Sequence, residues 1–141
     1  MKEAFKEYFE IMGRIENAYH EAALKMKMSD SEMDILYVLY SYPEGCNQSV
    51  LYKQSCLTRS TVNTALKKME GKGVLSILPG EGRNTRVVAT DSGRELIENT
   101  VCRVIAIENE IYDSWSQEEQ ELFMRINRDY AQKLSERVKG M

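Results

Sequence analysis

Residues 47–90 constrain the fold of this chain most, because two short helical patterns are followed directly by a glycine-rich turn and two strand-like runs. Asn47 is a favourable N-cap for a helix over residues 48–54. Thr58 is a favourable N-cap for a second helix, which extends to about residue 70. Two short capped helices in tandem predict a helix-turn-helix.

The segment after these helices has the pattern of a β-ribbon. Gly71 and Gly73 end the second helix, since glycine readily adopts the conformation that follows a helix C-terminus. Residues 74–78 and 86–90 are rich in apolar and β-branched side chains, and the turn between them contains proline and glycine. A hairpin in this position predicts a wing attached to the helix-turn-helix.

Helical patterns account for most of the remaining chain. We predict helices over residues 3–27, 30–40 and 91–113, and a last helix after residue 116. S-x-x-E capping boxes at Ser29 and Ser116 mark two of the starts. The first helix has apolar residues at alternating spacings of three and four, a heptad pattern that predicts packing against another long helix, such as one from a second subunit. These positions are Phe5, Tyr8, Met12, Ile15, Tyr19, Ala22 and Met26.

The charge of the chain is distributed unevenly. Residues 53–86 carry seven Lys or Arg and two Glu, a net charge of +5, whereas the whole chain has a formal net charge of −3. An acidic protein with one basic segment is expected to attract a polyanion to one face rather than to its whole surface. Because this segment coincides with the helix-turn-helix and the wing, it predicts double-stranded DNA as a partner.

The second helix of the motif has the chemistry of a recognition helix. Its first turns carry hydroxyl and amide side chains and one arginine, which suit hydrogen bonds in the major groove. Val62, Ala65, Leu66 and Met69 share the opposite face and are expected to pack inward. The alternative is an amphipathic surface helix with a solvated polar face. The DNA contacts predicted on the two helices are Gln48, Ser49, Thr58, Arg59, Ser60, Thr61, Asn63, Thr64, Lys67 and Lys68.

The predicted wing, residues 79–86, carries one arginine at its apex and one at the base of its return strand, Arg83 and Arg86. A narrow, glycine-flanked tip with arginine fits the minor groove, where the negative potential of DNA is enhanced. We predict both arginines as DNA contacts, with Arg83 the more important. The alternative for Arg86 is to brace the wing by pairing with an acid such as Glu81.

Together these patterns predict a mainly α-helical fold with a small β wing of two or three strands. We expect a dimerisation helix over residues 1–28, a winged helix-turn-helix DNA-binding region over 29–91, and C-terminal dimerisation helices over 92–141. The length of 141 residues is sufficient for a full hydrophobic core.

The composition argues against several other classes of protein. The chain has no apolar run of about 18 residues, and its charged N-terminus lacks the apolar stretch of a signal peptide, so we expect a cytoplasmic protein. With a single histidine, His20, and three cysteines in no metal-binding spacing, we expect neither a metal nor a cofactor. The sequence also lacks a nucleophile–base pair, a phosphate-binding loop and paired carboxylates, so we do not expect an enzyme.

The segment around the predicted recognition helix resembles the MarR family of bacterial transcription regulators. Leu57–Val74, LTRSTVNTALKKMEGKGV, is similar to the family pattern L-S-R-S-T-V-T-R-L-L-D-R-L-E-K-K-G-L. Residues 81–86 are similar to the wing pattern D-x-R-D-x-R, and residues 89–93 to the L-T-x-x-G that follows it. The order of elements, with one long helix before the winged region and two after it, extends the resemblance over nearly the whole chain.

Three positions depart from the family pattern. Thr64 stands where the pattern has an arginine, which removes one expected DNA contact. Glu81 and Asn84 replace the two acids of the wing motif, and Asn84 cannot supply the charge of the usual wing salt bridge. Arg83 is then left freer to contact DNA.

The resemblance implies a homodimeric repressor in which the first helix and the two C-terminal helices of each subunit interlock. Such a dimer binds a pseudo-palindromic operator with half-sites about 10 bp apart. The resemblance also implies release from DNA by a small aromatic or phenolic effector bound between the winged and dimerisation regions. The dimerisation residues are then Phe5, Tyr8, Met12, Ile15, Tyr19, Phe123, Ile126, Tyr130 and Leu134. The candidate tyrosines of the effector cleft, which are alternatively residues at the edge of the core, are Tyr19, Tyr37 and Tyr40.

Two alternative functions follow from the same residues. A winged helix can serve as a protein interaction module without DNA binding, although the basic segment argues against this role. A cysteine redox-sensing regulator is the other alternative, but the first 45 residues lack the N-terminal cysteine of peroxide-sensing relatives. Cys46, expected in an exposed loop, and Cys56, beside the recognition helix, are the two candidates. The alternative for Cys56 is a small buried apolar residue between two helices, and a purely structural role is likewise the alternative for Cys46.

Overall fold

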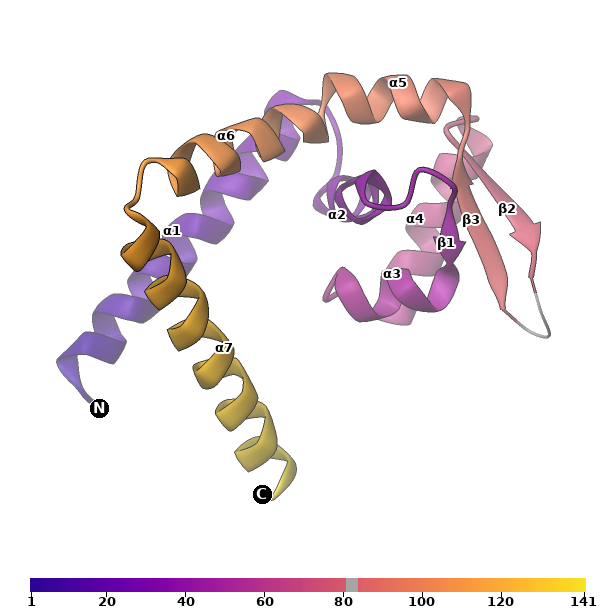
Figure 1. Ribbon diagram of the computed structural model, residues 1–141. Helices are drawn as coiled ribbons and strands as arrows, with labels where there is room; N and C mark the ends of the chain where they lie inside the picture. The colour runs from indigo at the N-terminus through magenta and orange to yellow at the C-terminus, as the bar shows by residue number, and fades with distance from the viewer. Residues whose placement is uncertain (81–83) are drawn as a thin grey trace. The chain divides into compact units, whose positions relative to one another are not determined.

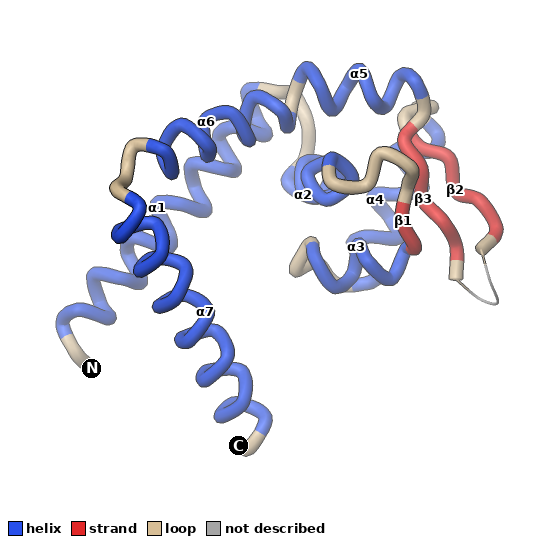
Figure 2. Tube along the Cα trace, viewed as in Figure 1, coloured by secondary structure: helices blue, strands red, loops and turns tan. Residues whose placement is uncertain are grey.

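Helices dominate the computed structural model, which describes residues 1–80 and 84–141 (Figures 1 and 2). The chain divides into two units, Met1–Val104 and Ile105–Met141. The first unit contains helices α1 to α5, the three strands of the described chain and the start of α6, and the second contains the rest of α6 and all of α7. The predicted mainly α-helical winged fold is confirmed.

The helices of the first unit begin close to the predicted residues. Thr58 Oγ1 accepts a hydrogen bond from Thr61 N at 3.2 Å, and Thr90 Oγ1 accepts one from Gly93 N at 3.1 Å, so both threonines are side-chain N-caps. Asn47 also precedes a helix, but its side chain makes no capping hydrogen bond. The helices are α1 (Glu3–Lys25), α2 (Asp30–Tyr40), α3 (Gln48–Gln54), α4 (Arg59–Gly71) and α5 (Asp91–Asn99).

The wing belongs to an antiparallel sheet of three strands in the order β1-β3-β2. The strands are β1 (Cys46–Asn47), β2 (Leu75–Pro79) and β3 (Thr85–Ala89), and Val87 of β3 pairs with Ile77 on one side and Cys46 on the other. The third strand, which the sequence left open, is only two residues long. It depends on Gly45, which has a φ of +86° and where a Cβ would lie 2.6 Å from Val87 O.

The most deeply buried side chains of the first unit include residues from three helices and one strand. Ile35 and Leu36 of α2, Leu51 of α3, Leu66 of α4 and Val87 of β3 are at most 1% exposed. On α4, the four residues predicted to pack inward are all buried, which confirms the orientation of that helix: Val62, Ala65, Leu66 and Met69. Burial of this face fixes which side chains of α4 point to solvent.

The single helix predicted over residues 91–113 is wrong. The structure has two helices, α5 and α6 (Val101–Asp113), separated at Thr100, whose backbone lies at φ −124° and ψ −86°. The buried Thr100 donates its hydroxyl proton to Leu96 O at 2.5 Å, which satisfies a carbonyl at the end of α5. The sequence has neither glycine nor proline at this break, and its helical periodicity continues across it. The pattern therefore predicted one helix where the structure has two.

The second unit buries none of its residues within Ile105–Met141. Helix α7 (Gln117–Lys139) starts at the capping box predicted at Ser116, where Ser116 N donates to Glu119 Oε1 at 2.9 Å and Glu119 N donates to Ser116 Oγ at 3.1 Å. Hydrogen bonds from the backbone N–H of Ser116, and then from its hydroxyl, to the Glu119 carboxylate lower the pKa of this group. The ring of Trp115 lies 5.0 Å from that of Phe123 and orders the turn between α6 and α7.

Both long helices display apolar side chains to solvent. On α7, Phe123, Ile126 and Leu134 are 46–50% exposed, and on α1, Met12 and Ile15 are 44% and 52% exposed. A continuous row of exposed apolar side chains usually marks a surface that is covered by a partner. Among the described residues, no helix combines the length and the apolar composition needed to cross a membrane.

Candidate nucleic-acid interface

The solvent face of α4 carries most of the predicted DNA contacts. Ser60, Thr61, Thr64 and Lys67 are exposed there, and Thr58 precedes them as the N-cap. Short hydroxyl side chains allow the helix backbone to approach base edges and phosphates closely, and Lys67 adds a positive charge further along the helix. The structure therefore presents a polar, unobstructed first turn of the kind that a recognition helix needs.

A network of hydrogen bonds joins α3, α4 and the wing. Gln48 Nε2 donates to Asn63 Oδ1 at 2.5 Å and to Tyr52 Oη at 2.6 Å, and Tyr52 Oη donates to Asn63 Oδ1 at 2.7 Å. Thr85 at the start of β3 donates its hydroxyl proton to Gln48 Oε1. Gln48 and Asn63, both predicted to contact DNA, thus use their amides within the protein and fix the wing relative to α4.

Tyr52 and Thr85 were missed by the sequence analysis. Tyr52 lies one helical turn after Gln48, and its hydroxyl bridges two helices, a role that the spacing of α3 alone does not reveal. The guanidinium of Arg59 also lies 5.1 Å from the centre of the Tyr52 ring, within the range of a cation–π contact. The contact places the guanidinium of Arg59, the first residue of α4, over a side chain of α3.

Glu32 connects α2 to the C-terminal end of α4. Its carboxylate is 10% exposed, and its Oε1 lies 3.2 Å from Lys68 Nζ and 3.6 Å from Lys72 Nζ. The capping box predicted at Ser29 is therefore only half formed, because Ser29 accepts from Glu32 N while the Glu32 side chain turns to the lysines. Lys68, predicted to extend the positive charge toward DNA, has an acidic partner within the chain.

Arg86 braces the base of the wing. Its Nη2 donates to Glu44 O at 2.5 Å and lies 3.5 Å from Gly45 O, so the side chain holds β3 against the loop that precedes β1. The carbonyl of Glu44 is a partner that the sequence did not suggest. Arg83, predicted as the main minor-groove contact, and Glu81 both lie outside the described residues.

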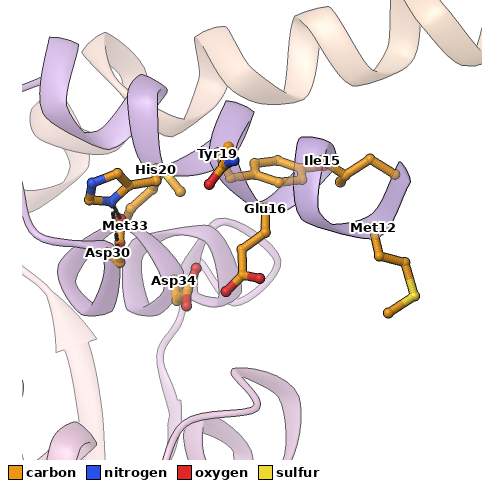
Figure 3. A pocket seen from close by; sticks show the side chains of 9 residues that line it. Met12, Ile15, Glu16, Tyr19, His20, Asp30, Met33 and Asp34 are labelled. Atoms are coloured by element: carbon orange, nitrogen blue, oxygen red, sulfur yellow. Dashed lines mark hydrogen bonds and ion pairs between the residues drawn. The ribbon is translucent and has the colours of Figure 1, made fainter. Parts of the chain in front are cut away.

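A groove of about 520 Å³ lies between α1 and α2 within the first unit (Figure 3). One of the three predicted effector tyrosines, Tyr19, lines it, whereas Tyr37 and Tyr40 are exposed on α2 and do not. The remaining lining combines apolar side chains, of which Met12 and Ile15 were predicted as dimerisation residues, with acidic side chains to which the sequence assigned no role. The lining residues are Met12, Ile15, Glu16, Asn17, Tyr19, His20, Asp30, Met33 and Asp34.

The groove is electrostatically negative. His20 Nδ1 lies 2.9 Å from both carboxylate oxygens of Asp30, an ion pair when the imidazole is protonated. Burial, followed by the nearby charge of Asp30, raises the pKa of Asp34 to about 6. Arginine and lysine do not occur among the lining residues. The carboxylates of this groove thus have little cationic compensation.

The two candidate cysteines are placed differently from expectation. Cys46, expected in an exposed loop, is 4% exposed in β1, and burial raises the pKa of its thiol against a smaller lowering by Arg86. A buried thiol with a raised pKa is a poor redox sensor. Cys56 is exposed and has a φ of +57°, so it is not the small buried residue that the sequence offered as an alternative.

Comparison with known proteins decides the family. The profile of the MarR family matches residues 28–81, the segment that contains the helix-turn-helix and strand β2 of the wing. The HTH-type transcriptional regulator YdgJ of Bacillus subtilis (strain 168) is 33% identical over 101 residues, which cover 70% of this chain and 61% of YdgJ. The helix-turn-helix region of this chain, residues 28–81, belongs to the MarR family of transcription regulators. The matched region spans less than two thirds of YdgJ.

Solved structures show the same fold along most of the chain. MepR of S. aureus in its DNA-binding conformation is 19% identical and superposes with a TM-score of 0.78, covering 92% of this chain and 98% of MepR. MepR in its complex with DNA is 18% identical and has a TM-score of 0.74, and the match covers 95% of this chain and 98% of MepR. BpsR of Bordetella bronchiseptica, whose DNA binding is regulated by 6-hydroxynicotinic acid, is 15% identical with a TM-score of 0.68 and covers 89% of this chain and 98% of BpsR. MarR-family regulators are not enzymes, as the sequence predicted for this chain.

Proposed function

We propose that this protein is a transcription regulator that binds double-stranded DNA, with α4 in the major groove and the wing in the minor groove. The observation that carries the proposal is the exposed hydroxyl face of α4, held in place by the network among Gln48, Tyr52, Asn63 and Thr85. A pre-ordered recognition helix binds without the entropic cost of arranging its side chains and the wing at the moment of contact.

The charge distribution supports DNA as the partner. The basic residues of the helix-turn-helix include Lys53, Arg59 and Lys67, which are exposed, whereas Lys68 and Lys72 are paired with Glu32. Phosphate contacts supply affinity without sequence information, and hydroxyl groups near base edges supply selectivity. The exposed cations would therefore supply affinity, and the hydroxyl side chains of Ser60, Thr61 and Thr64 would supply selectivity.

The regulator is proposed to act as a homodimer. The exposed apolar rows on α1 and α7 favour a second copy as their cover, since burying them against another chain removes them from water. A two-fold dimer places two recognition helices about 34 Å apart, which corresponds to successive major grooves on one side of a pseudo-palindromic operator. Three of the predicted dimerisation residues, Phe5, Phe123 and Leu134, lie on these rows, whereas Met12 and Ile15 line the groove between α1 and α2.

The regulator is proposed to be a repressor that an effector releases from DNA. The groove between α1 and α2 supports this part of the proposal, because it is large enough for a small molecule and borders the helix that anchors α4 through Glu32. A ligand that changes the position of α2 would therefore also change the position of the recognition helix. BpsR offers a precedent among proteins of this fold for regulation by a small molecule.

Fluorescence anisotropy tests DNA binding. The protein is titrated into a labelled duplex from its own upstream region and into an unrelated duplex, at two salt concentrations. We expect tighter, salt-sensitive binding to the upstream duplex. Lys67→Ala should weaken binding to both duplexes and lower the salt slope by about one, whereas Lys139→Ala, at the end of α7, should change neither. Equal weak binding to both duplexes, or no binding, would favour the protein-interaction role instead.

A further inference from the structure

We propose that the groove between α1 and α2 binds an organic cation, with an amine between its carboxylates and an aromatic or aliphatic body against its apolar wall. The proposal rests on the proposed function only where it makes this ligand the effector of DNA binding. The charge of the lining specifies the ligand as a cation, which is opposite in charge to an aromatic acid.

The charges of the lining carry the argument. Glu16, Asp30 and Asp34 contribute three carboxyl groups, and His20 is the single lining residue that can become positive. Figure 3 shows Glu16 extending from α1 and Asp34 from α2 into the space between the helices. A carboxylate ligand would meet repulsion there and find neither arginine nor lysine on the lining.

The raised pKa of Asp34 indicates that this carboxyl group has no compensating positive charge in the groove. Burial and the charge of Asp30 both disfavour the ionised form of Asp34, and the pKa of this group is about 6. His20 lies against Asp30, so a protonated imidazole would pair with that carboxylate. A bound ammonium group would supply the missing counter-charge and donate hydrogen bonds to the carboxylates.

The remaining wall suits the body of such a ligand. Met12, Ile15 and Tyr19 of α1 are 37–52% exposed along one side of the groove, and the buried Met33 of α2 also lines it. Methionine side chains adapt to ligands of different shape, and the face of a tyrosine ring attracts cations. An apolar wall beside an acidic one selects a molecule with a compact positive charge and an apolar body.

Isothermal titration calorimetry with two charge-reversed probes tests the proposal in the absence of DNA. Tyramine and 4-hydroxyphenylacetate carry the same phenol ring, one with an ammonium group and the other with a carboxylate. We expect tyramine to bind at least about tenfold more tightly, since one charge-assisted hydrogen bond contributes about 1.5 kcal/mol or more. Equal affinities, tighter binding of the acid, or no binding of tyramine at millimolar concentration would overturn the proposal.

A matched pair of variants locates the binding site. Asp34→Asn keeps the size of the side chain, removes the charge, and should weaken tyramine binding about tenfold. Glu98→Gln removes one acid from the exposed face of α5, outside the groove, and should leave binding unchanged. Circular dichroism spectra of both variants serve as the control for folding. Equal losses in the two variants would mean that net charge, and not the groove, attracts the amine.

The same probes separate the proposal from DNA binding. If tyramine binds in the groove and the protein fails to bind DNA, the ligand site stands and the regulator function fails. If tyramine binds and lowers the affinity for the upstream duplex, and Asp34→Asn reduces this effect, the amine is an effector. If the protein binds DNA but not tyramine, the regulator function stands and the cation site is refuted.

Discussion

Helices α4 and α7 are both amphipathic, but α4 buries Val62, Leu66 and Met69 within its own chain, whereas α7 buries no residue. The difference separates two sources of stability. The winged part covers its apolar side chains with its own helices and sheet, while the long C-terminal helix displays Phe123 and Ile126 to solvent. The winged part is therefore stabilised by contacts within its own unit. The apolar face of α7 is not covered by other residues of Ile105–Met141, so it needs a surface outside this segment to cover it.

The largest effect is expected in the core of the winged part. Leu66→Ala removes a side chain that is 1% exposed and leaves a cavity, which should lower the free energy of unfolding by about 3 kcal/mol. Urea denaturation at several protein concentrations measures this loss, which should be nearly the same at each concentration. A loss below about 1 kcal/mol would show that α4 is not anchored as the structure describes.

A smaller and concentration-dependent effect is expected on α7. Ile126→Ala should weaken dimerisation by about 2 kcal/mol, because an apolar side chain is lost from the proposed contact between copies. Sedimentation velocity over a hundredfold range of protein concentration measures the shift toward monomer. Lys133→Ala, which removes an exposed charge on the same helix, is the control. Identical sedimentation of Ile126→Ala and the unchanged protein would remove α7 from the interface.

The link between α2 and α4 should have a modest energetic effect. Glu32→Gln should lower the free energy of unfolding by about 1 kcal/mol, since Lys68 and Lys72 are themselves more than half exposed. Lys68 would also become available to phosphates, so the salt slope of DNA binding should steepen. Chemical denaturation and anisotropy measure the two effects, with Glu98→Gln as the control. An unchanged salt slope would place Lys68 away from the DNA.

The smallest effect concerns the groove and depends on pH. Because the pKa of Asp34 is about 6 in the folded protein and 3.8 in the reference state, the folded protein binds the proton more tightly. Its contribution to stability is therefore greatest below about pH 4 and is lost as the pH rises through 6. Asp34→Asn should remove this dependence and, after allowance for solvent screening, stabilise the protein at pH 7 by less than about 1 kcal/mol. Melting curves between pH 4 and 8 measure it, and a destabilised variant at pH 7 would contradict the assignment.

Much of the fold follows from local signals in the sequence. Thr58, Thr90 and Ser116 cap helices where hydroxyl residues precede a helical pattern, and the apolar face of α4 is the one that periodicity predicts. These features depend on neighbours within a few residues, so a single sequence contains the information. The break at Thr100 does not, because a buried hydroxyl and its surroundings override a continuous helical pattern.

The candidate site is less predictable than the fold because its contacts join distant residues. The periodicity of α4 places Asn63 on the polar side, but only the structure shows Gln48 and Tyr52 binding its amide. Glu32 has the spacing of a capping residue and instead pairs with Lys68 of α4, which lies 36 residues further along the chain. A long side chain can bond either to a residue nearby in the sequence or to a distant one, and a sequence pattern does not determine which bond forms.

Sedimentation velocity with a fluorescent upstream duplex tests the central claim most directly. The account predicts that two copies of the chain move with one duplex, and that the complex dissociates when salt is raised. Ile126→Ala should reduce this complex while leaving the winged part folded. Two copies per duplex would establish a dimeric DNA-binding regulator. A duplex that sediments alone at every protein concentration, or that carries a single copy, would contradict it.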